Sequence, residues 1–255
     1  MNWRKQLLTQ AKFSLMSFRR NPAATFFTVV LPLIFLVLFT SIFGNETFSA
    51  TGARVATFYV PGILALSIIS ATMINLAITT VTRRENGILK RVRGTPLRPW
   101  VYVAGEVFAA LAITALMTVL VVGIGWLVFD VALSASGIPN LLISLTLGAA
   151  VFCALGLALS GLIPNEKSAP AFTNMIALPL YFVSDIFVIT ENTPTTIALI
   201  GDLFPVKHLA KALTQSFDPF SSGTPMAWSH WAVMAGWGIV GALVAVKKFQ
   251  WTPKQ

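Results

Sequence analysis

Two carboxylic acids lie within long apolar stretches of the 255-residue sequence, where a titratable group could carry out proton chemistry. Glu106 lies about a turn and a half into one stretch, and Asp185 lies near the outer end of another. Ionisable side chains at membrane depth are rare and usually functional. We expect Glu106 to pair with Arg98 or another cytosolic basic group. We expect Asp185 to reach water or to help release a bound molecule.

Other residue types that support catalysis are not arranged for it. Ser160-Gly161 resembles part of a serine protease motif, but position 158 is alanine and no histidine is placed to act as a base. His208 and His230 lie far from any acidic cluster with metal-ligand spacing. A phosphate-binding loop requires a Gly-Lys dipeptide, which the sequence lacks. We therefore predict no catalytic residue, no metal site and no cofactor bound by this chain.

The composition indicates an integral membrane protein. Hydrophobic residues make up 56% of the chain and charged residues only 11%, with a mean hydropathy of +0.78, whereas soluble domains contain about 25% charged residues. A spanning helix needs about 20 mostly apolar residues. Six stretches meet this length, at 22–43, 59–82, 100–129, 140–163, 169–189 and 226–246.

The basic residues predict the orientation of these six spans. Fifteen of the eighteen lysines and arginines fall on the side that holds both termini, and only Arg54, Lys207 and Lys211 fall opposite. Positive charge in short connections is retained on the cytoplasmic side, so we predict that both termini are cytosolic. Because the charge gathers at span ends, it suits lipid headgroups, and we do not expect nucleic acid as a partner.

Residues 83–98 form a basic connection that carries six of the eighteen basic residues. The run 84–93 contains no helix breaker except Gly87, and Gly94 followed by Pro96 is a typical helix stop. The pattern predicts a short capped helix along the membrane surface. From the charges alone, a solvated loop that only sets topology is the more economical interpretation.

Two further segments are expected to lie against the membrane rather than to cross it. Residues 1–20 form an amphipathic pattern typical of an interfacial helix, and Pro32 is expected to kink the span that follows. The outer connection 190–225 has apolar residues at helical spacing, so we place two short half-buried helices there. The apolar face of the first segment comprises Trp3, Leu7, Leu8, Ala11, Leu15 and Phe18.

The second span carries a stripe of small and polar residues at helical spacing. Helix packing and the lining of a pathway explain this stripe equally well. Because the stripe has no charge, a molecule that passes along it would be amphipathic or apolar. The stripe comprises Ser67, Ala71, Asn75, Thr79 and Thr82.

Four segments in order along nearly the whole chain resemble one family. The basic segment, with Arg84-Glu85, Gly87, Leu89-Lys90-Arg91 and Gly94-Thr95-Pro96-Leu97, is similar to the coupling segment of ABC type-2 permeases, particularly those of daunorubicin and other drug exporters. Residues 59–64, 178–184 and 204–213 resemble the opening of the family's second span, the end of its fifth and the outer segment before its last. Asp185 departs from the family pattern, which usually has glycine at this position. The resemblance therefore does not extend to how tightly the outer gate closes or to which substrate is accepted.

The resemblance implies a single all-α transmembrane permease domain over 1–255, with six spans, an interfacial helix, a cytosolic coupling helix and outer half-buried helices. It implies that two permease copies, identical or sister chains, form a dimer, and that each coupling helix sits on a separate ATPase subunit that binds ATP and Mg. We assign coupling to Arg84, Glu85, Gly87, Leu89, Lys90, Arg91, Gly94, Thr95 and Pro96. We assign the substrate pathway to Ser67, Asn75, Thr79, Pro179, Ser184 and Asp185.

The expected function is therefore that of the membrane subunit of an ATP-driven exporter for drug-like or lipid-like amphiphiles. The family's form further implies a multi-pass protein of a prokaryotic plasma membrane, in contact with membrane lipids. An ion-gradient-driven transporter is the alternative, since Pro32 and Pro179 could mark broken helices. An intramembrane hydrolase is the least favoured class, because its nucleophile lacks a base.

Overall fold

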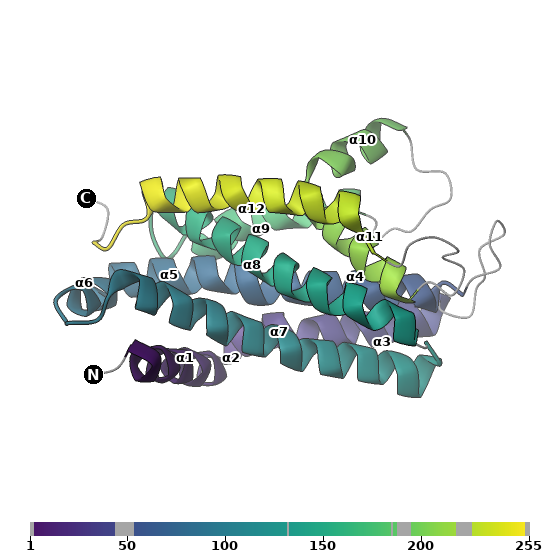
Figure 1. Ribbon diagram of the computed structural model, residues 1–255, viewed down its shortest axis with the longest axis horizontal. Helices are drawn as coiled ribbons and strands as arrows, with labels where there is room; N and C mark the ends of the chain where they lie inside the picture. Colours follow the sequence, from purple (N-terminus) through teal and green to yellow (C-terminus); the bar gives the residue numbers. More distant parts are fainter. Residues whose placement is uncertain are drawn as a thin grey trace.

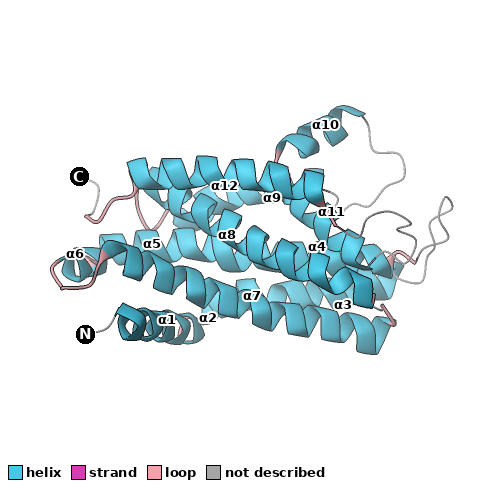
Figure 2. Ribbon diagram, in the orientation of Figure 1, coloured by secondary structure: helices cyan, strands magenta, loops and turns pink. Residues whose placement is uncertain are grey.

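A computed structural model describes residues 3–43, 54–131, 133–184, 186–187, 195–217 and 226–252. The described residues form a bundle of helices without a strand (Figures 1 and 2). The elements are α1 (Trp3–Arg19), α2 (Pro22–Thr25), the π-helix η1 (Phe26–Val30), α3 (Leu31–Phe43), α4 (Ala56–Ile69), the π-helix η2 (Ser70–Ile74), α5 (Asn75–Glu85), α6 (Ile88–Arg93), α7 (Pro99–Phe129), the 3-10 helix η3 (Ala135–Gly137), α8 (Ile138–Leu162), α9 (Ala169–Val183), α10 (Thr195–Leu203), α11 (Pro205–Phe217) and α12 (Trp228–Lys248).

Five continuous helical segments in the described part of the chain are long and apolar enough to cross a bilayer. They are Pro22–Phe43, Ala56–Glu85, Pro99–Phe129, Ala135–Leu162 and Trp228–Lys248, and they match five of the six expected spans. The all-α membrane class is thereby confirmed. The sixth expected span, 169–189, contains the 15-residue helix α9, which is about 22 Å long against a hydrocarbon core of about 30 Å. The count of six spans stays a prediction.

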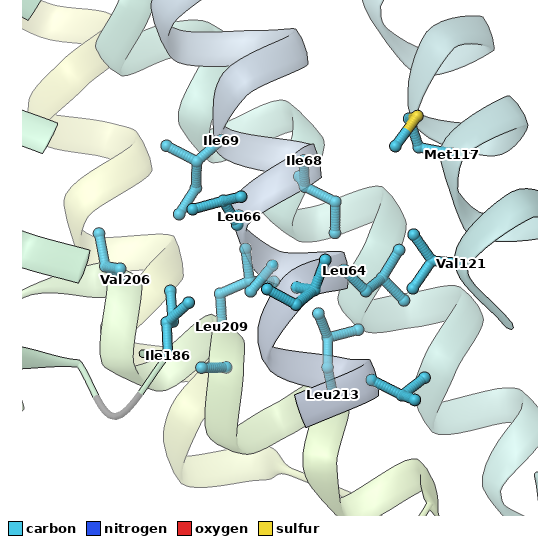
Figure 3. Packing of buried hydrophobic residues seen from close by; sticks show 14 of the residues in the cluster. Leu64, Leu66, Ile68, Ile69, Met117, Val121, Ile186, Val206, Leu209 and Leu213 are labelled. Atoms are coloured by element: carbon cyan, nitrogen blue, oxygen red, sulfur yellow. The ribbon is translucent and has the colours of Figure 1, made fainter. Parts of the chain in front are cut away.

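The core of the bundle surrounds α4. Twelve of its fourteen residues are buried, because α3, α7, α8 and α11 all pack against it. Figure 3 shows Leu64 of α4 between Val121 of α7 and Leu209 of α11. Since α4 is hydrophobic on every face, it is suited to the interior of a membrane bundle.

The first two spans each contain a π-helical turn. In η1 the Leu31 amide donates to the Phe26 carbonyl, five residues back, just before Pro32. Proline cannot donate to the preceding turn and its ring crowds the carbonyl four residues earlier, so a widened turn accommodates it. The expected disturbance at Pro32 therefore takes the form of a π-helix. In the second span, η2 separates α4 from α5.

Small residues allow close packing between the second and fourth spans. Gly156 of α8 lies directly against η2, and a Cβ atom there would be only 2.7 Å from the Met73 carbonyl oxygen. Cys153, one turn earlier, is buried in the same region. The small-residue side of α8 thus serves helix packing, as expected in membranes.

The amino-terminal helix α1 packs against the first part of α7. Its buried positions are Leu7 and Ser14, while Leu8 and Phe13 are exposed. The expected apolar face is largely turned toward the bundle: Leu7 is buried, Ala11, Leu15 and Phe18 are partly buried, and Trp3 and Leu8 are exposed. The contact with α7 is made through polar as well as apolar side chains, since Ser14 donates to Glu106 and the Trp3 ring lies against that of Trp100.

The outer segment contains the two expected short helices, but they differ in burial. Helix α11 inserts against α4, α8 and α12 and buries most of its residues. Helix α10 projects from the bundle (Figure 1), with Leu199 and Leu203 exposed. Both helices expected in this segment are thus present, with α11 more buried and α10 more exposed than half-buried helices would be. Helix α11 is amphipathic and surrounded by protein, which allows a short helix to lie at membrane depth.

Candidate substrate cavity and coupling segment

The basic connection 83–98 folds into a turn and a short helix at the end of the bundle where both termini lie (Figure 1). Helix α5 ends at Glu85, and α6 follows after Asn86-Gly87. Gly87 has φ of +68°, in the left-handed region that favours glycine. The single helix expected over 84–93 is thus divided, because the chain reverses at Gly87 before α6 begins.

The stop after α6 lies where the sequence places it, but its geometry differs from a left-handed cap. Gly94 has a right-handed conformation, with φ of −80°, and its amide donates to the Arg91 carbonyl. The Thr95 hydroxyl donates to the Val92 carbonyl at 2.7 Å, and so satisfies a carbonyl group at the end of the helix. The side chain of Thr95, rather than the conformation of Gly94, completes this cap.

Arg84 is the most deeply buried cation of this segment, with 1% exposure. Its guanidinium donates to the carbonyls of Ser160 and Ile163, both at 2.9 Å, and of Pro164 at 3.3 Å. These carbonyls lie at the carboxyl end of α8, where backbone acceptors lack helical partners and the helix dipole favours a cation. Arg84 therefore fixes α5 to α8 from within the protein.

The other predicted coupling residues divide into two groups. The first group faces the protein. Leu89 of α6 is fully buried. Glu85 lies beside Arg84, with 3.5 Å between Glu85 Oε1 and Arg84 Nε. The remaining positions other than Gly87 are exposed and form the accessible surface of the segment: Lys90, Arg91, Gly94, Thr95 and Pro96. Gly87 is partly exposed.

A buried polar cluster joins α1, α5 and α7 next to the coupling segment. Glu106 Oε1 accepts hydrogen bonds from Gln10 Nε2 at 2.9 Å, from the Ser14 hydroxyl and from Arg83 Nη1 at 2.5 Å. Arg83 Nη1 also donates to the Tyr102 hydroxyl at 3.0 Å. Since both charges are paired and further hydrogen bonds surround them, the cost of burying them is offset.

The partner of Glu106 is Arg83 rather than Arg98, which is exposed at the start of α7. Gln10 and Ser14, which also bind Glu106, were not predicted from the sequence. These two residues are four apart, so they share one face of a helix, and polar residues at that spacing within an amphipathic helix were the available signal. Only the packing of α1 on α7 brings them to Glu106.

A cavity of about 190 Å³ borders this cluster, and a second cavity of about 310 Å³ adjoins it. Arg83 and Glu106 line the smaller one. The larger one extends from Asn21 and Pro170, near the α6 end of the bundle, to Phe187 toward the other end. The two cavities share the lining residues Asn21, Ala24, Asn75, Ile78 and Thr79.

The larger cavity is lined mainly by apolar side chains, together with uncharged polar groups. Phe27, Phe35 and Phe187 contribute aromatic surface. Its polar lining residues are Asn21, Thr28, Ser70, Asn75, Thr79, Asn174 and Tyr181. None of its described lining residues is charged. An apolar cavity with a few polar groups is the usual form of a small-molecule site.

The structure brings two of the predicted pathway residues to this cavity. Asn75 and Thr79 line it, and the Thr79 hydroxyl donates to Asn75 Oδ1 at 3.4 Å. Ser67 instead is fully buried and donates to the Ile63 carbonyl at 2.8 Å. Ser184 is also buried, and Pro179 is exposed without lining the cavity. Asp185 lies outside the described residues.

His208 and His230 lie together on the other end of the bundle. His208 Nε2 is 2.8 Å from the Asp202 carbonyl oxygen and therefore donates to it, so its Nδ1 accepts from His230 Nδ1, also at 2.8 Å. This arrangement joins α11 to α12. Within the described ranges, no three His, Cys, Asp or Glu side chains gather at metal-binding distance.

Comparison with known proteins places this architecture in a family. The family profile described as ABC-2 type transporter matches residues 5–217. The daunorubicin resistance ABC transporter permease protein DrrB1 of Streptomyces coeruleorubidus is 29% identical over 245 residues, covering 94% of this chain and 82% of that protein. A Bacillus subtilis (strain 168) protein named as a transport permease, YvfS, is 21% identical over 226 residues and 89% of each chain.

A third relative is an Escherichia coli (strain K12) protein named as a multidrug ABC transporter permease, YbhR. It is 21% identical over 160 residues, covering 63% of this chain and 43% of that protein. The family profile extends from the amino-terminal helix through the coupling segment, both cavities and α11. The chain is therefore a multi-pass membrane protein and belongs to the ABC-2 type transporter family, whose members are membrane subunits of ABC transporters.

Proposed function

We propose that the chain is the permease of an ATP-driven exporter that moves drug-like or lipid-like amphiphiles out of the cytosol or inner leaflet. The observation that carries this proposal is the larger cavity, whose lining is apolar, aromatic and uncharged. Such a surface is suited to a molecule with apolar rings or chains and a few hydrogen-bonding groups. The name of DrrB1 refers to daunorubicin resistance, which agrees with this substrate class.

A partner ATPase would supply the driving force through α6. The exposed residues Lys90, Arg91 and Pro96 offer the contact surface, while Leu89 anchors α6 to the bundle. Helix α5 connects this surface to the cavity, because it ends beside α6 and also carries Asn75 and Thr79. A displacement of α6 would therefore be transmitted to the cavity wall along one helix.

Two buried attachments determine how α5 could move. Arg83 attaches it to α7 through Glu106, and Arg84 attaches it to the end of α8. Both attachments lie where α5 meets the turn at Asn86-Gly87. A movement of α5 and α6 would therefore also move α7 and α8. ATP and Mg would bind to the partner subunit, and this chain would supply no residue to the hydrolysis.

The proposed assembly contains two permease copies in a prokaryotic plasma membrane, with both termini in the cytosol. The exposed apolar residues Met175, Leu178 and Phe182 of α9 lie on the helix that forms one wall of the larger cavity. A second copy placed against this wall would enclose the cavity between the two chains. The positive charge at the α6 end of the bundle supports the proposed orientation.

The alternative is a transporter driven by an ion gradient. The buried carboxylate of Glu106 beside a cavity is the feature that favours it, since such groups occur in proton relays. Its close pairing with Arg83 favours a structural role instead.

Transport in inverted membrane vesicles separates these two functions. The chain would be produced together with an ABC ATPase subunit from the same genome, and daunorubicin uptake would be measured with ATP, with ATP plus vanadate, and with an imposed proton gradient. The proposed function predicts uptake that requires ATP and is blocked by vanadate. Uptake driven by the gradient without ATP would favour the alternative, and a variant of Glu106 would then be the first to examine.

A further inference from the structure

A third cavity of about 240 Å³ lies on the opposite side of α9 from the larger cavity. Its walls come from η2, α8, α9, α12 and residues 204–206. We name it the rear groove, and its described lining comprises Met73, Phe152, Leu155, Ala158, Leu159, Leu162, Ile176, Leu180, Phe204, Pro205, Val206, Trp237, Val240, Gly241 and Val244. Only the indole of Trp237 carries a polar side-chain group among them.

The rear groove exists because α9 stands apart from α8 and α12. In the described part of the chain, α9 packs mainly on α5, η2, α10 and α11. The space left between α9 and the closely packed pair α8 and α12 lies at the depth of the hydrocarbon, since it is bounded by the middle of a spanning helix. Water is a poor occupant for a groove with almost no polar partner.

One end of the rear groove is closed by the junction between α10 and α11. The Trp237 indole donates to the Leu203 carbonyl at 2.8 Å, and its ring stacks on Phe204 with 5.9 Å between centroids. An acyl chain that lies along the groove therefore extends away from this junction, toward Leu162 and Val244. That end is the one that bears α6 and the termini (Figure 1).

Basic residues follow the groove at this open end. Lys247 and Lys248 end α12 three and four residues after Val244, so they continue the same side of the helix. Lys167 lies in the connection from α8 to α9, next to Glu166, and both are exposed. Three lysines against one carboxylate give this end a net positive charge where lipid headgroups would lie.

We propose that the rear groove binds one acyl chain of an anionic phospholipid from the leaflet at the α6 end, with its phosphate beside Lys247 and Lys248. The apolar lining of the groove suits a hydrocarbon chain, and the positive charge at its mouth suits an anionic headgroup. Helix α9 separates this lipid from the larger cavity, because Ile176 and Leu180 face the groove while Asn174 and Tyr181 face the cavity. The bound acyl chain packs against the side of α9 that faces away from the larger cavity, where α8 and α12 stand apart from it.

The test is the retention of lipid by the full chain. The protein would be placed in nanodiscs of equal parts dioleoylphosphatidylglycerol and dioleoylphosphatidylcholine, extracted in mild detergent and examined by native mass spectrometry. We expect one retained phosphatidylglycerol per chain, with about tenfold preference over phosphatidylcholine, because each basic residue near the surface favours an anionic lipid. Retention of neither lipid, or equal retention of both, would overturn the proposal.

A matched pair of variants locates the binding site. Val244→Trp fills the rear groove, whereas Leu243→Trp adds the same bulk at the neighbouring position, which is exposed and does not line the groove. Val244→Trp should lose the retained lipid and Leu243→Trp should keep it. Val240→Trp provides a second groove variant if Val244→Trp is poorly folded by gel filtration. If the groove and control variants behave alike, the lipid binds elsewhere and the proposal is wrong.

Replacing basic residues tests the contribution of the lipid headgroup separately from that of its acyl chain. Replacing Lys247 and Lys248 together by glutamine should abolish the preference for phosphatidylglycerol, while the control replacement of Lys5 and Lys12, which removes two exposed cations from α1, should leave it unchanged. An unchanged preference in the first variant would overturn the assigned headgroup position. None of these results depends on the transported substrate or on the ATPase.

Discussion

Arg83 of α5 and Glu106 of α7 form a buried ion pair, with 2.5 Å between Arg83 Nη1 and Glu106 Oε1. The side chains are only 13% and 6% exposed, and α1 adds Gln10 and Ser14 to the same carboxylate. Three helices that meet at the coupling end of the bundle are thus held by one acidic group. This relationship makes Glu106 the first residue to vary.

Replacing Glu106 by glutamine should lower the stability of the protein by about 3–5 kcal/mol, because Arg83 would remain buried without its counter-charge. The thermal midpoint of the purified protein in detergent measures this loss. The control is Glu166→Gln, which changes an exposed residue that contacts only Asn86 among the described side chains. Recovery of the midpoint in the double variant Arg83→Met with Glu106→Leu is expected, since an apolar pair can replace a buried ion pair. A midpoint of Glu106→Gln equal to that of the control would contradict the structural role of the pair.

Replacing Arg84 by lysine should detach α5 from the end of α8, even though the charge is kept. A lysine ammonium cannot reproduce the planar array of donors that Arg84 directs at three carbonyls. Hydrogen bonds that involve a charged group contribute about 1.5–3 kcal/mol each, so we expect a loss of at least about 2 kcal/mol. Arg93→Lys on exposed α6 is the control and should be neutral. Equal thermal midpoints for the two variants would show that the attachment contributes nothing.

Gly87→Ala should impair coupling more than Gly94→Ala. Gly87 has a left-handed conformation that costs a residue with a Cβ atom about 1–2 kcal/mol, although open space surrounds it. Gly94 is right-handed, and a Cβ atom there would lie at an ordinary 3.4 Å from the Arg91 carbonyl. The measurement is the stimulation of the partner ATPase by substrate in proteoliposomes. The opposite ranking would show that coupling depends on the end of α6 at Gly94 more than on the turn at Gly87.

Thr79→Phe should reduce transport without lowering stability, because the larger ring can occupy the shared part of the two cavities. The matched control is Thr146→Phe on α8, where the residue is exposed and lines neither cavity. We expect at least a tenfold loss of substrate-stimulated ATP hydrolysis for the first variant, equivalent to about 1.4 kcal/mol, and none for the second. Normal stimulation in Thr79→Phe would remove this cavity from the proposed route.

The contact between α10 and α11 should weaken at low pH. A hydrogen bond from Lys207, at 2.9 Å, together with the positive charges of Lys211 and Lys207, lowers the pKa of Asp202 below its usual 3.8. Because the folded-state pKa is depressed, this contribution to stability is present above pH 3.8 and is lost as the pH falls through the lower folded value. Asp202→Asn should therefore lower the thermal midpoint at pH 7, and the difference from the original protein should shrink below pH 3.8. A difference that is independent of pH would exclude this ion pair as its source.

Local signals predicted much of the fold. The division of 190–225 into two helices, the start of the first span at residue 22 and the stop after Arg93 all occur where the sequence places them. Each depends on residues that are close in the chain, such as the Asn21 side chain that accepts from the Ala24 amide. The break at Gly87 was not predicted, since a single glycine is tolerated within many helices.

The candidate site was only partly predictable. Asn75 and Thr79 were identified from their spacing and do line the larger cavity, but Ser67 lies on the same stripe and is enclosed by protein. The stripe continues across η2, where a π-helical turn changes the rotation of the residues that follow. An ideal helical spacing therefore could not show which members of the stripe share one surface.

By itself, the sequence determined the membrane class, five spanning helices and the basic connection, because hydrophobic length and charge asymmetry act through the bilayer and require no knowledge of packing. Only the tertiary structure decided that Glu106 pairs with Arg83 instead of Arg98, and that Arg84 faces α8 while Lys90 and Arg91 face outward. Successive residues of an α-helix are separated by about 100°. The direction of a side chain is therefore set by the rotation of its helix against its neighbours, which long-range packing alone fixes.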